Sequence, residues 1–289
     1  MPSPSVDIVV VTYNPGDTIT SFLQSAVGAE GVESVTVVDN ASGDDVAQRA
    51  ASDAEVAFVQ TGRNAGYGAG ANVGAPRGSA KWILVSNADI VLDPGAVAAL
   101  LHVAETDEAI GAVGPRVQEI DGTTYPSARP LPTLLLGAGH ALFGKRWPNN
   151  PWTRRYRLNL HPLGGEVDAG WLSGSCFLVR RSAWEQLGGF DERYFMFFED
   201  VDFGRRLGLA GYRQVWTPLA VVTHLGGHSY RSDPAPMLKA HHDSARLYVA
   251  SAYPHRWQAP VRAAVAAGLA AREKAEVAAA RRRLATRAD

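Results

Sequence analysis

The stretch KWILVSNADIVLDP, residues 81–94, decides which fold the chain can adopt. Its apolar run Trp82–Val85 predicts a buried strand, and the polar residues Asn87-Ala88-Asp89 follow almost at once. Asp93-Pro94 then predicts the start of a helix. Ligands of an open α/β sheet bind outside the carboxyl ends of its strands, so Asp89 could hold a divalent cation against a phosphate group. The alternative is that Asp89 only caps a turn.

The first hundred residues continue this alternation of strand and helix. Apolar, β-branched runs at 7–12, 34–38, 56–59 and 81–85 predict strands, and the segments 18–27, 44–51, 68–74 and 95–103 predict helices. This order predicts an α/β, Rossmann-like, mostly parallel central sheet with helices on both faces. Three of the strands end in polar residues: Thr12-Tyr13-Asn14, Asp39-Asn40 and Asn87-Ala88-Asp89. We expect these three ends to meet at one edge of the sheet.

The second half is less regular. Residues 167–181 form a strand-like run interrupted by small residues, and a helix is predicted to begin near Phe198. Two strands, YRQVW and LAVVTH, follow, and the chain is predicted to be helical after Pro236. The basic, Ala- and Arg-rich tail of this helical part is interpreted as solvated surface or, alternatively, as a membrane or oligomer contact.

The segment 122–165 is rich in Pro and Gly and mixes cations with aromatic side chains. These residues are Lys145, Arg146, Trp147, Trp152, Arg154, Arg155, Tyr156 and Arg157. Such a mixture is typical of a membrane interface or of binding to a phosphate-bearing lipid. A long surface excursion with snorkelling side chains explains it equally well.

The composition limits the class of protein. A chain of 289 residues with 46% hydrophobic residues can bury a large core, and a net charge of −1 indicates no attraction to nucleic acid. Cys176 is the single cysteine, so we expect a reducing compartment and interpret it as a small packed hydrophobe. Since no apolar run reaches the roughly 20 residues of a membrane span, we expect a cytoplasmic protein or one that rests on a membrane surface.

Titratable side chains gather at two further places. FFEDVDF, residues 197–203, brings Glu199, Asp200 and Asp202 to a predicted loop-to-helix junction. They could cap the helix dipole, or an acid beside the aromatic run 194–198 could have a raised pKa and act as a general base. His224, at the end of LAVVTH, is a candidate metal ligand or a structural histidine. His241 and His242 are predicted to lie on a helix surface.

The glycine-rich stretch GYGAGANVG, residues 66–74, does not fit a dinucleotide fingerprint, because the third glycine would fall on Val73. A nicotinamide-dependent oxidoreductase is therefore disfavoured. We expect these glycines to let the backbone pass close to a ligand, with Arg63 and Asn64 as donors to phosphate or sugar.

Several motifs occur in a fixed order: VVTYNP, VVDNAS, GRNAGYGAGANVG, VSNAD, WLSGSCFLVRR, GGFDERYFMFFEDVDFGRRLGLAGYR and HLGGHS. Together they resemble the family 2 inverting glycosyltransferases of the GT-A fold over residues 6–250. The resemblance implies a transferase domain over 1–253, with a nucleotide-sugar-binding half at 1–120 and an acceptor and catalytic half at 121–253. A basic helical tail would then occupy 254–289.

The resemblance also assigns roles to individual residues. The donor-binding set is Thr12, Tyr13, Asn14 and Asp39 for the base and ribose, Arg63, Asn64 and Asn72 for the pocket wall, Asn87 and Asp89, and Arg206 for the diphosphate. The family's metal-binding D-x-D has asparagine as its first residue here, so Asp89, completed by His224, would hold Mg²⁺ or Mn²⁺. Asp200 matches the catalytic base, and Trp171, Ser173, Gly174 and Glu199 match acceptor contacts.

Two features narrow the resemblance. The Q-x-x-R-W signature of processive synthases is missing, since Tyr253 stands where Gln would precede Arg256-Trp257, so transfer of a single sugar is expected. N-x-D together with FEDVDF and HLGGHS is most similar to bacterial rhamnosyltransferases, which implies dTDP-L-rhamnose as donor and a polyprenyl-diphosphate-linked GlcNAc acceptor. The implied place is the inner face of the plasma membrane, with peripheral contact and a possible homo-oligomer.

Two alternatives stay open. One is another family 2 transferase that uses a UDP-linked hexosyl or galactofuranosyl donor. The other is a catalytically silent nucleotide-sugar-binding protein, although a chain that keeps Asp89, Asp200 and His224 together favours an enzyme.

Overall fold

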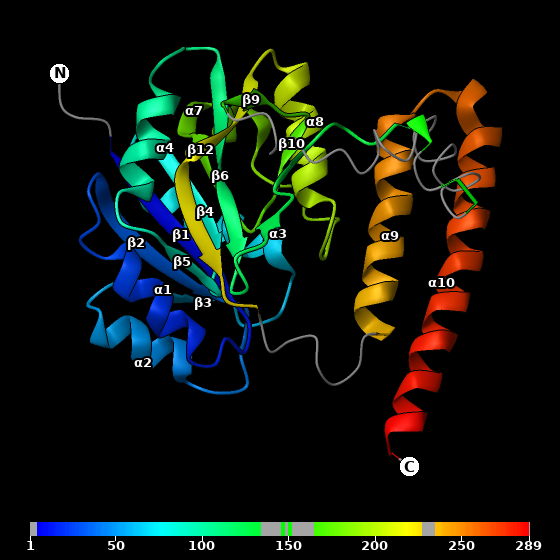
Figure 1. Ribbon diagram of the computed structural model, residues 1–289, viewed down its shortest axis with the longest axis horizontal. Coiled ribbons are helices and arrows are strands. Elements are labelled where there is room, and N and C mark those ends of the chain that lie inside the picture. The colour runs from blue at the N-terminus through cyan, green and yellow to red at the C-terminus, as the bar shows by residue number, and fades with distance from the viewer. Residues whose placement is uncertain (1–4, 134–145, 148–149, 152–164, 227–234, 289) are drawn as a thin grey trace.

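A mixed sheet of ten strands runs through the described part of the computed structural model, which comprises residues 5–133, 146–147, 150–151, 165–226 and 235–288 (Figure 1). The strands of this sheet are β1 (Val6–Thr12), β2 (Val32–Asp39), β3 (Ala57–Gln60), β4 (Trp82–Asn87), β5 (Ile90–Leu92), β6 (Ile110–Glu119), β7 (Thr124–Tyr125), β9 (Val167–Asp168), β11 (Cys176–Arg180) and β12 (Arg213–His224). Two further strands, β8 (Ala128–Arg129) and β10 (Trp171–Leu172), lie outside it. The helices are α1 (Thr18–Ala26), α2 (Val46–Asp53), α3 (Tyr67–Gly74), α4 (Ala96–Ala104), α7 (Arg181–Leu187), α8 (Glu199–Leu209), α9 (Ala235–Ala252) and α10 (Ala259–Ala288), with short 3₁₀ helices at Ala75–Arg77 and Arg256–Gln258.

The main strand order is β3-β2-β1-β4-β11-β6-β12-β5, with β7 beside β6 and β9 beside β12. β8 and β10 pair separately as a two-stranded ribbon. The predicted strands and helices of the first hundred residues are all present, and β1 to β4 are parallel. β11 runs antiparallel to both of its neighbours, while β6 and β12 are parallel to each other. The prediction of a mostly parallel α/β sheet is confirmed.

Alternation of side chains along the central strands builds two cores. In β4, Trp82 and Leu84 pack into the core beneath α1, α2 and α4, whereas Ile83 and Val85 face the core beneath α3, α7 and α8. The strand is apolar on both faces because helices cover both faces, which explains the continuous run in its sequence. The single cysteine, Cys176, is buried in the first core, and burial raises the pKa of its thiol to about 12.

Two predicted boundaries differ from the structure, and one strand was not predicted. YRQVW and LAVVTH form one strand, β12, because a register irregularity between Trp216 and Val221 absorbs the proline at 218 without ending the pairing. The stretch after Asp89 forms β5 before α4 begins at Ala96, since Gly95 with φ +80° makes the turn into the helix. β6 was not predicted, although its ten residues lie at the centre of the sheet.

The C-terminal helices α9 and α10 lie side by side as a hairpin beside the sheet domain (Figure 1). The prediction that His242 is a surface residue is wrong: its side chain is buried between the helices, and Nε2 lies 3.0 Å from Oε2 of Glu276. No helix of the described residues has the length and hydropathy needed to cross a membrane. Most of the basic and aromatic residues of the segment 122–165, and the GHS part of HLGGHS, lie outside the described residues.

Candidate active site

The three predicted polar strand ends meet at one edge of the sheet. In the β1–β2 register Thr12 lies opposite Asp39, and in the β1–β4 register Val11 lies opposite Asn87. Thr12 Oγ1 donates a hydrogen bond of 3.0 Å to Asp39 Oδ1, and the Asn40 N–H donates to the Thr12 carbonyl at 2.8 Å. The parallel strands therefore deliver these side chains to a common site, as predicted from their positions in the sequence.

The loops after β1 and β2 hold each other through the predicted base- and ribose-binding residues. Asp39 is buried and accepts a hydrogen bond of 2.9 Å from the Ser42 N–H through Oδ2. Asn14 has φ +48° and accepts from the Gly43 N–H at 2.9 Å. Tyr13, which precedes Asn14 in the chain, is 47% exposed, so its ring is accessible to a planar base. Asp39 and Asn14 therefore hold the loops at this edge through hydrogen bonds to backbone N–H groups.

Asp89 and His224 come together at the ends of β4 and β12. His224 Nε2 lies 3.2 Å from Asp89 Oδ2, and Nδ1 lies 3.3 Å from both carboxylate oxygens of Glu119. The pKa of His224 is raised to about 9, chiefly by its hydrogen bond to Asp89 and also by Glu119, against the effect of burial. This carboxylate–imidazole–carboxylate chain fixes the orientation of the ring.

The residues at this corner fit a divalent cation. Asp89 Oδ1 is buried and has no hydrogen-bond partner, which is costly for a carboxylate oxygen unless a ligand satisfies it. No group of three or more His, Cys, Asp or Glu side chains suited to a metal occurs among the described residues. Asp89 and His224 would supply two ligands, and a divalent cation takes further oxygen ligands such as those of a phosphate.

A short loop at residues 173–175 connects this corner to the predicted base. The Ser175 carbonyl accepts from the Asn87 N–H at 2.9 Å, and the Gly174 N–H donates to Asp200 Oδ2 at 2.9 Å. The Gly174 carbonyl accepts a short hydrogen bond from the Tyr67 hydroxyl. Ser173 is buried beside Ser175 and uses its backbone N–H to bond Ser127. Of the two predicted acceptor residues, Gly174 positions the carboxylate of Asp200 through its backbone N–H, and Ser173 ties the loop to Ser127.

Glu199, which is buried, and Asp200, which is half-buried, form an acidic pair at the start of α8. Burial raises the pKa of Asp200, while the N–H groups of Gly174 and Val201 stabilise its charged form. Burial, and then the charge of Asp200, raise the pKa of Glu199 further above its usual range. Glu199 Oε2 is buried without a hydrogen-bond partner. Asp200 is therefore the member of the pair that ionises first and can accept a proton.

The segment before this pair is strained and is supported by α9. Phe197 and Phe198 have φ of +67° and +66°, an unusual conformation for bulky residues that clusters at functional sites. Ser244 Oγ donates to the Met196 carbonyl at 2.8 Å, and the Tyr248 ring centroid lies 5.7 Å from that of Phe198. Contacts from α9 thus hold the backbone that carries Glu199 and Asp200.

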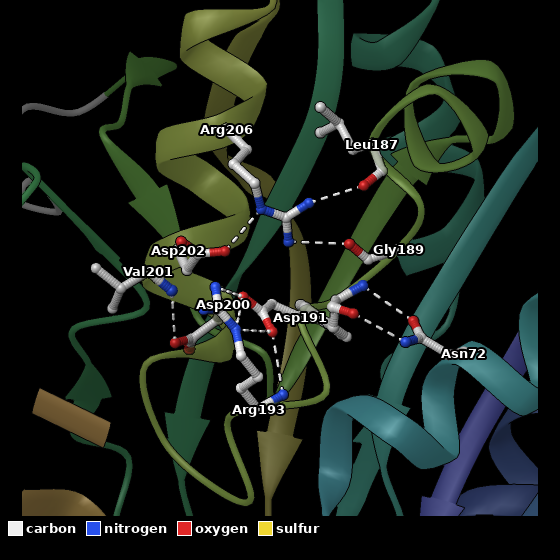
Figure 2. Close-up of polar contacts among 10 residues, drawn as sticks. Asn72, Leu187, Gly189, Asp191, Arg193, Asp200, Val201, Asp202 and Arg206 are labelled. Carbon is white, nitrogen blue, oxygen red and sulfur yellow. Dashed lines mark hydrogen bonds and ion pairs between the residues drawn. The ribbon is translucent and has the colours of Figure 1, made fainter. Parts of the chain in front are cut away.

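The contacts of Arg206 differ from those predicted for it. Its Nε donates to Asp202 at 2.6 Å, and its two other nitrogens donate to the carbonyls of Leu187 and Gly189 at 3.0 and 2.9 Å. Figure 2 shows the guanidinium directed toward these groups. Because each of its three nitrogens has a partner inside the protein, the structure gives Arg206 a structural role, and a contact with the diphosphate stays a prediction.

Asn72 also differs from its prediction. Its Nδ2 donates to the Phe190 carbonyl at 2.9 Å, and its Oδ1 accepts from the Phe190 N–H at 2.9 Å (Figure 2). The amide thus fixes the turn at 188–192 instead of facing a donor. Arg63 is exposed, and Asn64 is half-buried with Oδ1 accepting from the Gly66 N–H at 3.1 Å. Both stay candidate donor contacts.

The glycines of residues 66–74 serve packing. A Cβ on Gly74 would lie 2.3 Å from Val9, and one on Gly66 would lie 2.0 Å from the Phe195 carbonyl oxygen. These glycines allow α3 to approach β1 and allow the backbone at Gly66 to lie close to the backbone at Phe195. The close approach was expected to be to a ligand, but the neighbours in the structure are other segments of the protein.

Three residues near the site were not predicted. Tyr67 is half-buried, and its hydroxyl donates to the Gly174 carbonyl. Burial, and then the charge of Glu199, raise the pKa of this hydroxyl. Its position in GRNAGYG was the available signal. Glu119 and Arg129 gave none, because β6 and β8 were not recognised as strands.

Solved structures place the fold in a class. A mannosyltransferase from Pyrobaculum calidifontis in complex with GDP-Man and Mn²⁺ aligns with a TM-score of 0.60 at 19% identity, over 99% of this chain and 79% of its own. GalNAc-T7 with UDP, GalNAc and Mn²⁺ aligns with a TM-score of 0.61 at 14% identity, over 85% of this chain and 47% of its own. At these identities the likeness shows the fold alone, which is that of GT-A-like glycosyltransferases.

Sequence comparison gives the family. The model of the glycosyltransferase like family 2 matches residues 2–240, so the chain belongs to this family of glycosyltransferases. An N-acetylglucosaminyl-diphospho-decaprenol L-rhamnosyltransferase of Mycobacterium tuberculosis is 44% identical over 92% of this chain and 90% of its own. The rhamnosyltransferase WbbL of Escherichia coli is 39% identical over 80 residues, which are 28% of this chain and 30% of its own.

Proposed function

We propose that this chain transfers a single L-rhamnose from dTDP-L-rhamnose to GlcNAc on a polyprenyl diphosphate, with inversion at the anomeric carbon. The substrate assignment is supported by the 44% identity, along nearly the whole chain, to a relative with that name. The chemistry rests on one observation: the loop 173–175 joins the Asn87–Asp89 strand end to Asp200. The loop thereby connects the strand end that carries Asp89, the proposed metal ligand, with Asp200, the proposed base.

Asp200 would take the proton from the acceptor hydroxyl as that oxygen attacks the anomeric carbon opposite the leaving diphosphate. Two backbone N–H groups aim its carboxylate, and burial raises its pKa toward a value useful for a base. One displacement inverts the carbon and needs no covalent intermediate. The neighbouring Glu199, with the higher pKa, would stay protonated and present a hydroxyl instead of a second negative charge.

Asp89 and His224 would hold the divalent cation, Mg²⁺ or Mn²⁺. When bound, the ion would act as a Lewis acid that neutralises charge on the leaving diphosphate. Tyr13, Asn14, Asp39 and Thr12 would receive the base and ribose at the adjacent strand ends, with Arg63 and Asn64 beside them.

We further propose that the protein works at the inner face of the plasma membrane, in cell-wall or surface polysaccharide synthesis. A lipid-linked acceptor requires contact with a bilayer, and exposed Trp147 and Trp257 beside Arg146 and Arg256 have the character of interfacial residues. Assembly as a homo-oligomer stays a prediction.

Two measurements test this function. Calorimetric titration with dTDP and with UDP, each with and without Mn²⁺, should give tighter binding of dTDP and dependence on the metal. Incubation with dTDP-L-rhamnose and a short-chain prenyl-diphosphate GlcNAc should then give a rhamnosylated lipid. Tighter binding of UDP would favour a transferase with a uridine-linked donor, and nucleotide binding with neither transfer nor donor hydrolysis would indicate a catalytically silent protein.

A further inference from the structure

Arg129 lies opposite Trp171 in the β8–β10 ribbon. In this antiparallel register the two residues are direct partners, so their side chains emerge on the same face. The Arg129 guanidinium carbon lies 5.9 Å from the centroid of the Trp171 ring. The ribbon is fixed at both ends, because the Gly170 N–H donates to the Arg129 carbonyl at 2.9 Å and the Ser173 N–H donates to the Ser127 carbonyl at 2.8 Å.

The charge of Arg129 is not neutralised by any carboxylate in the described residues. Its Nε donates to the Pro126 carbonyl at 3.2 Å, which leaves the two terminal nitrogens for another partner. The partly buried Arg181 and Arg206 each pair with a buried carboxylate, at 2.7 Å and 2.6 Å, respectively. A half-buried guanidinium without such a partner is costly and is typical of an anion-binding position.

The same guanidinium lies within electrostatic reach of the base. Its positive charge lowers the pKa values of both Asp200 and Tyr125, although burial raises both. Two residues after β10 ends at Leu172, the Gly174 N–H donates a hydrogen bond to Asp200. The guanidinium of Arg129 and the indole of Trp171 are therefore paired on the ribbon, and the loop that leaves this ribbon bonds the carboxylate of Asp200.

We propose that Arg129 binds a phosphate of the acceptor's lipid diphosphate while the Trp171 indole carries the acceptor sugar, which presents its hydroxyl to Asp200. This inference rests on the proposed function. A guanidinium fork matches two phosphate oxygens, and an aromatic face suits the apolar side of a sugar ring. A donor diphosphate is the other source of the same chemistry. We assign the acceptor because the donor corner, at Asp89 and His224, is built on β4 and β12, whereas Arg129 belongs to the separate ribbon next to the base.

The test compares Arg129→Gln and Arg129→Lys with the wild type on two acceptors: the prenyl-diphosphate GlcNAc and an uncharged alkyl glycoside of GlcNAc. Loss of a hydrogen-bonded charge should raise KM for the diphosphate acceptor roughly 10- to 100-fold in Arg129→Gln. Arg129→Lys should recover part of this. At pH 8, above the pKa of Asp200, turnover of the uncharged glycoside and the Kd of dTDP with Mn²⁺ should stay within about twofold, which a general structural defect would not allow.

Arg49→Gln, on the exposed face of α2, is the matched control for loss of one arginine, and it should change none of these values. Equal losses on the charged and uncharged acceptors would overturn the inference. A weakened Kd for dTDP with an unchanged acceptor KM would assign Arg129 to the donor diphosphate and would also overturn it. If the wild type transfers rhamnose to neither acceptor, the proposed function itself fails, which is a separate result.

Discussion

The Oδ2 atom of Asp200 accepts a 2.9 Å hydrogen bond from the backbone N–H of Gly174, which belongs to the loop after β10. The same loop bonds Asn87 at the end of β4 and accepts from Tyr67 at the start of α3. The position of Asp200, the proposed base, is therefore set by the segment that also bonds the end of β4, two residues before the proposed metal ligand Asp89. Small changes in this loop would alter the distance between Asp200 and Asp89.

Replacement of Asp200 by Asn should lower kcat by about 10²–10⁴-fold, the usual contribution of a positioned base. The amide keeps the size of the side chain, so the Kd of dTDP measured by calorimetry with Mn²⁺ should stay close to that of the wild type. Initial rates of rhamnosyl transfer give the first value. Full turnover by Asp200→Asn would show that another group removes the acceptor proton.

Glu199→Gln should make the protein more stable at alkaline pH. The pKa of Glu199 is raised in the folded state, so the folded protein keeps a proton that the unfolded chain releases above about 4.5. The stability of the wild type should therefore fall as pH rises through and above this value. The variant carries a neutral group at every pH, so the difference in Tm should grow from pH 5 to pH 8, by roughly 2–4 °C for each kcal/mol.

The same variant identifies the base. Because Asp200 ionises first, while Glu199 is still protonated and neutral, Glu199→Gln should keep the acidic limb of the pH profile of kcat/KM close to its wild-type position. Disappearance of that limb would make Glu199 the titrating base.

Asp89→Asn should abolish the effect of Mn²⁺ on nucleotide binding. Neighbours of metal ligands alone contribute about 10–100-fold to metal affinity, so loss of a ligand should weaken the Mn²⁺-dependent binding of dTDP by at least about tenfold. Asn87→Ala is the control, and we expect it to change this binding far less. Equal losses in both variants would return Asn87 to the metal site.

Arg206→Gln should impair stability and leave donor binding intact. Removal of one partner from a buried ion pair costs up to about 3–5 kcal/mol, and Asp202 would lose the cation 2.6 Å from its carboxylate. Arg193→Gln removes a largely exposed pair with Asp191 and should cost at most about 1 kcal/mol. Urea denaturation gives both values. A weaker Kd for dTDP in Arg206→Gln would restore its predicted contact with the diphosphate.

The strand ends could be predicted because parallel strands bring residues such as Thr12, Asp39 and Asn87 to one edge whatever their separation in sequence. The motifs that hold Asp89 and His224 lie at such strand ends, and the motif that holds Asp200 lies at the start of helix α8. The exact partners of side chains could not be predicted. Arg206 matched a position in a motif, but its three hydrogen bonds depend on how the turn at 187–189 packs against α8.

Residues on unrecognised elements were missed for a different reason. β8 has two residues, and β6 mixes glycine, proline and charge with its apolar positions, so neither gives a clear alternating pattern. Arg129 and Glu119 consequently had no predicted neighbours. The support of the 195–198 segment by α9 depends on tertiary contacts across about 50 residues of chain, for which local sequence carries no signal.

Tyr248→Ala should lower turnover without weakening the donor. The ring is buried against Phe198 and Val201, and truncation of a buried aromatic side chain costs about 3–5 kcal/mol, part of which should release the left-handed backbone at Phe197 and Phe198. We therefore expect kcat and Tm to be lower than in the wild type. The Kd of dTDP with Mn²⁺ should be unchanged, because Tyr248 packs on the segment before Asp200. Trp257→Ala, at a side chain that is 76% exposed, is the matched loss of an aromatic residue and should leave kcat on a soluble short-chain acceptor unchanged. If Tyr248→Ala lowers Tm while kcat stays at the wild-type value, α9 contributes to the stability of the domain but does not position Asp200.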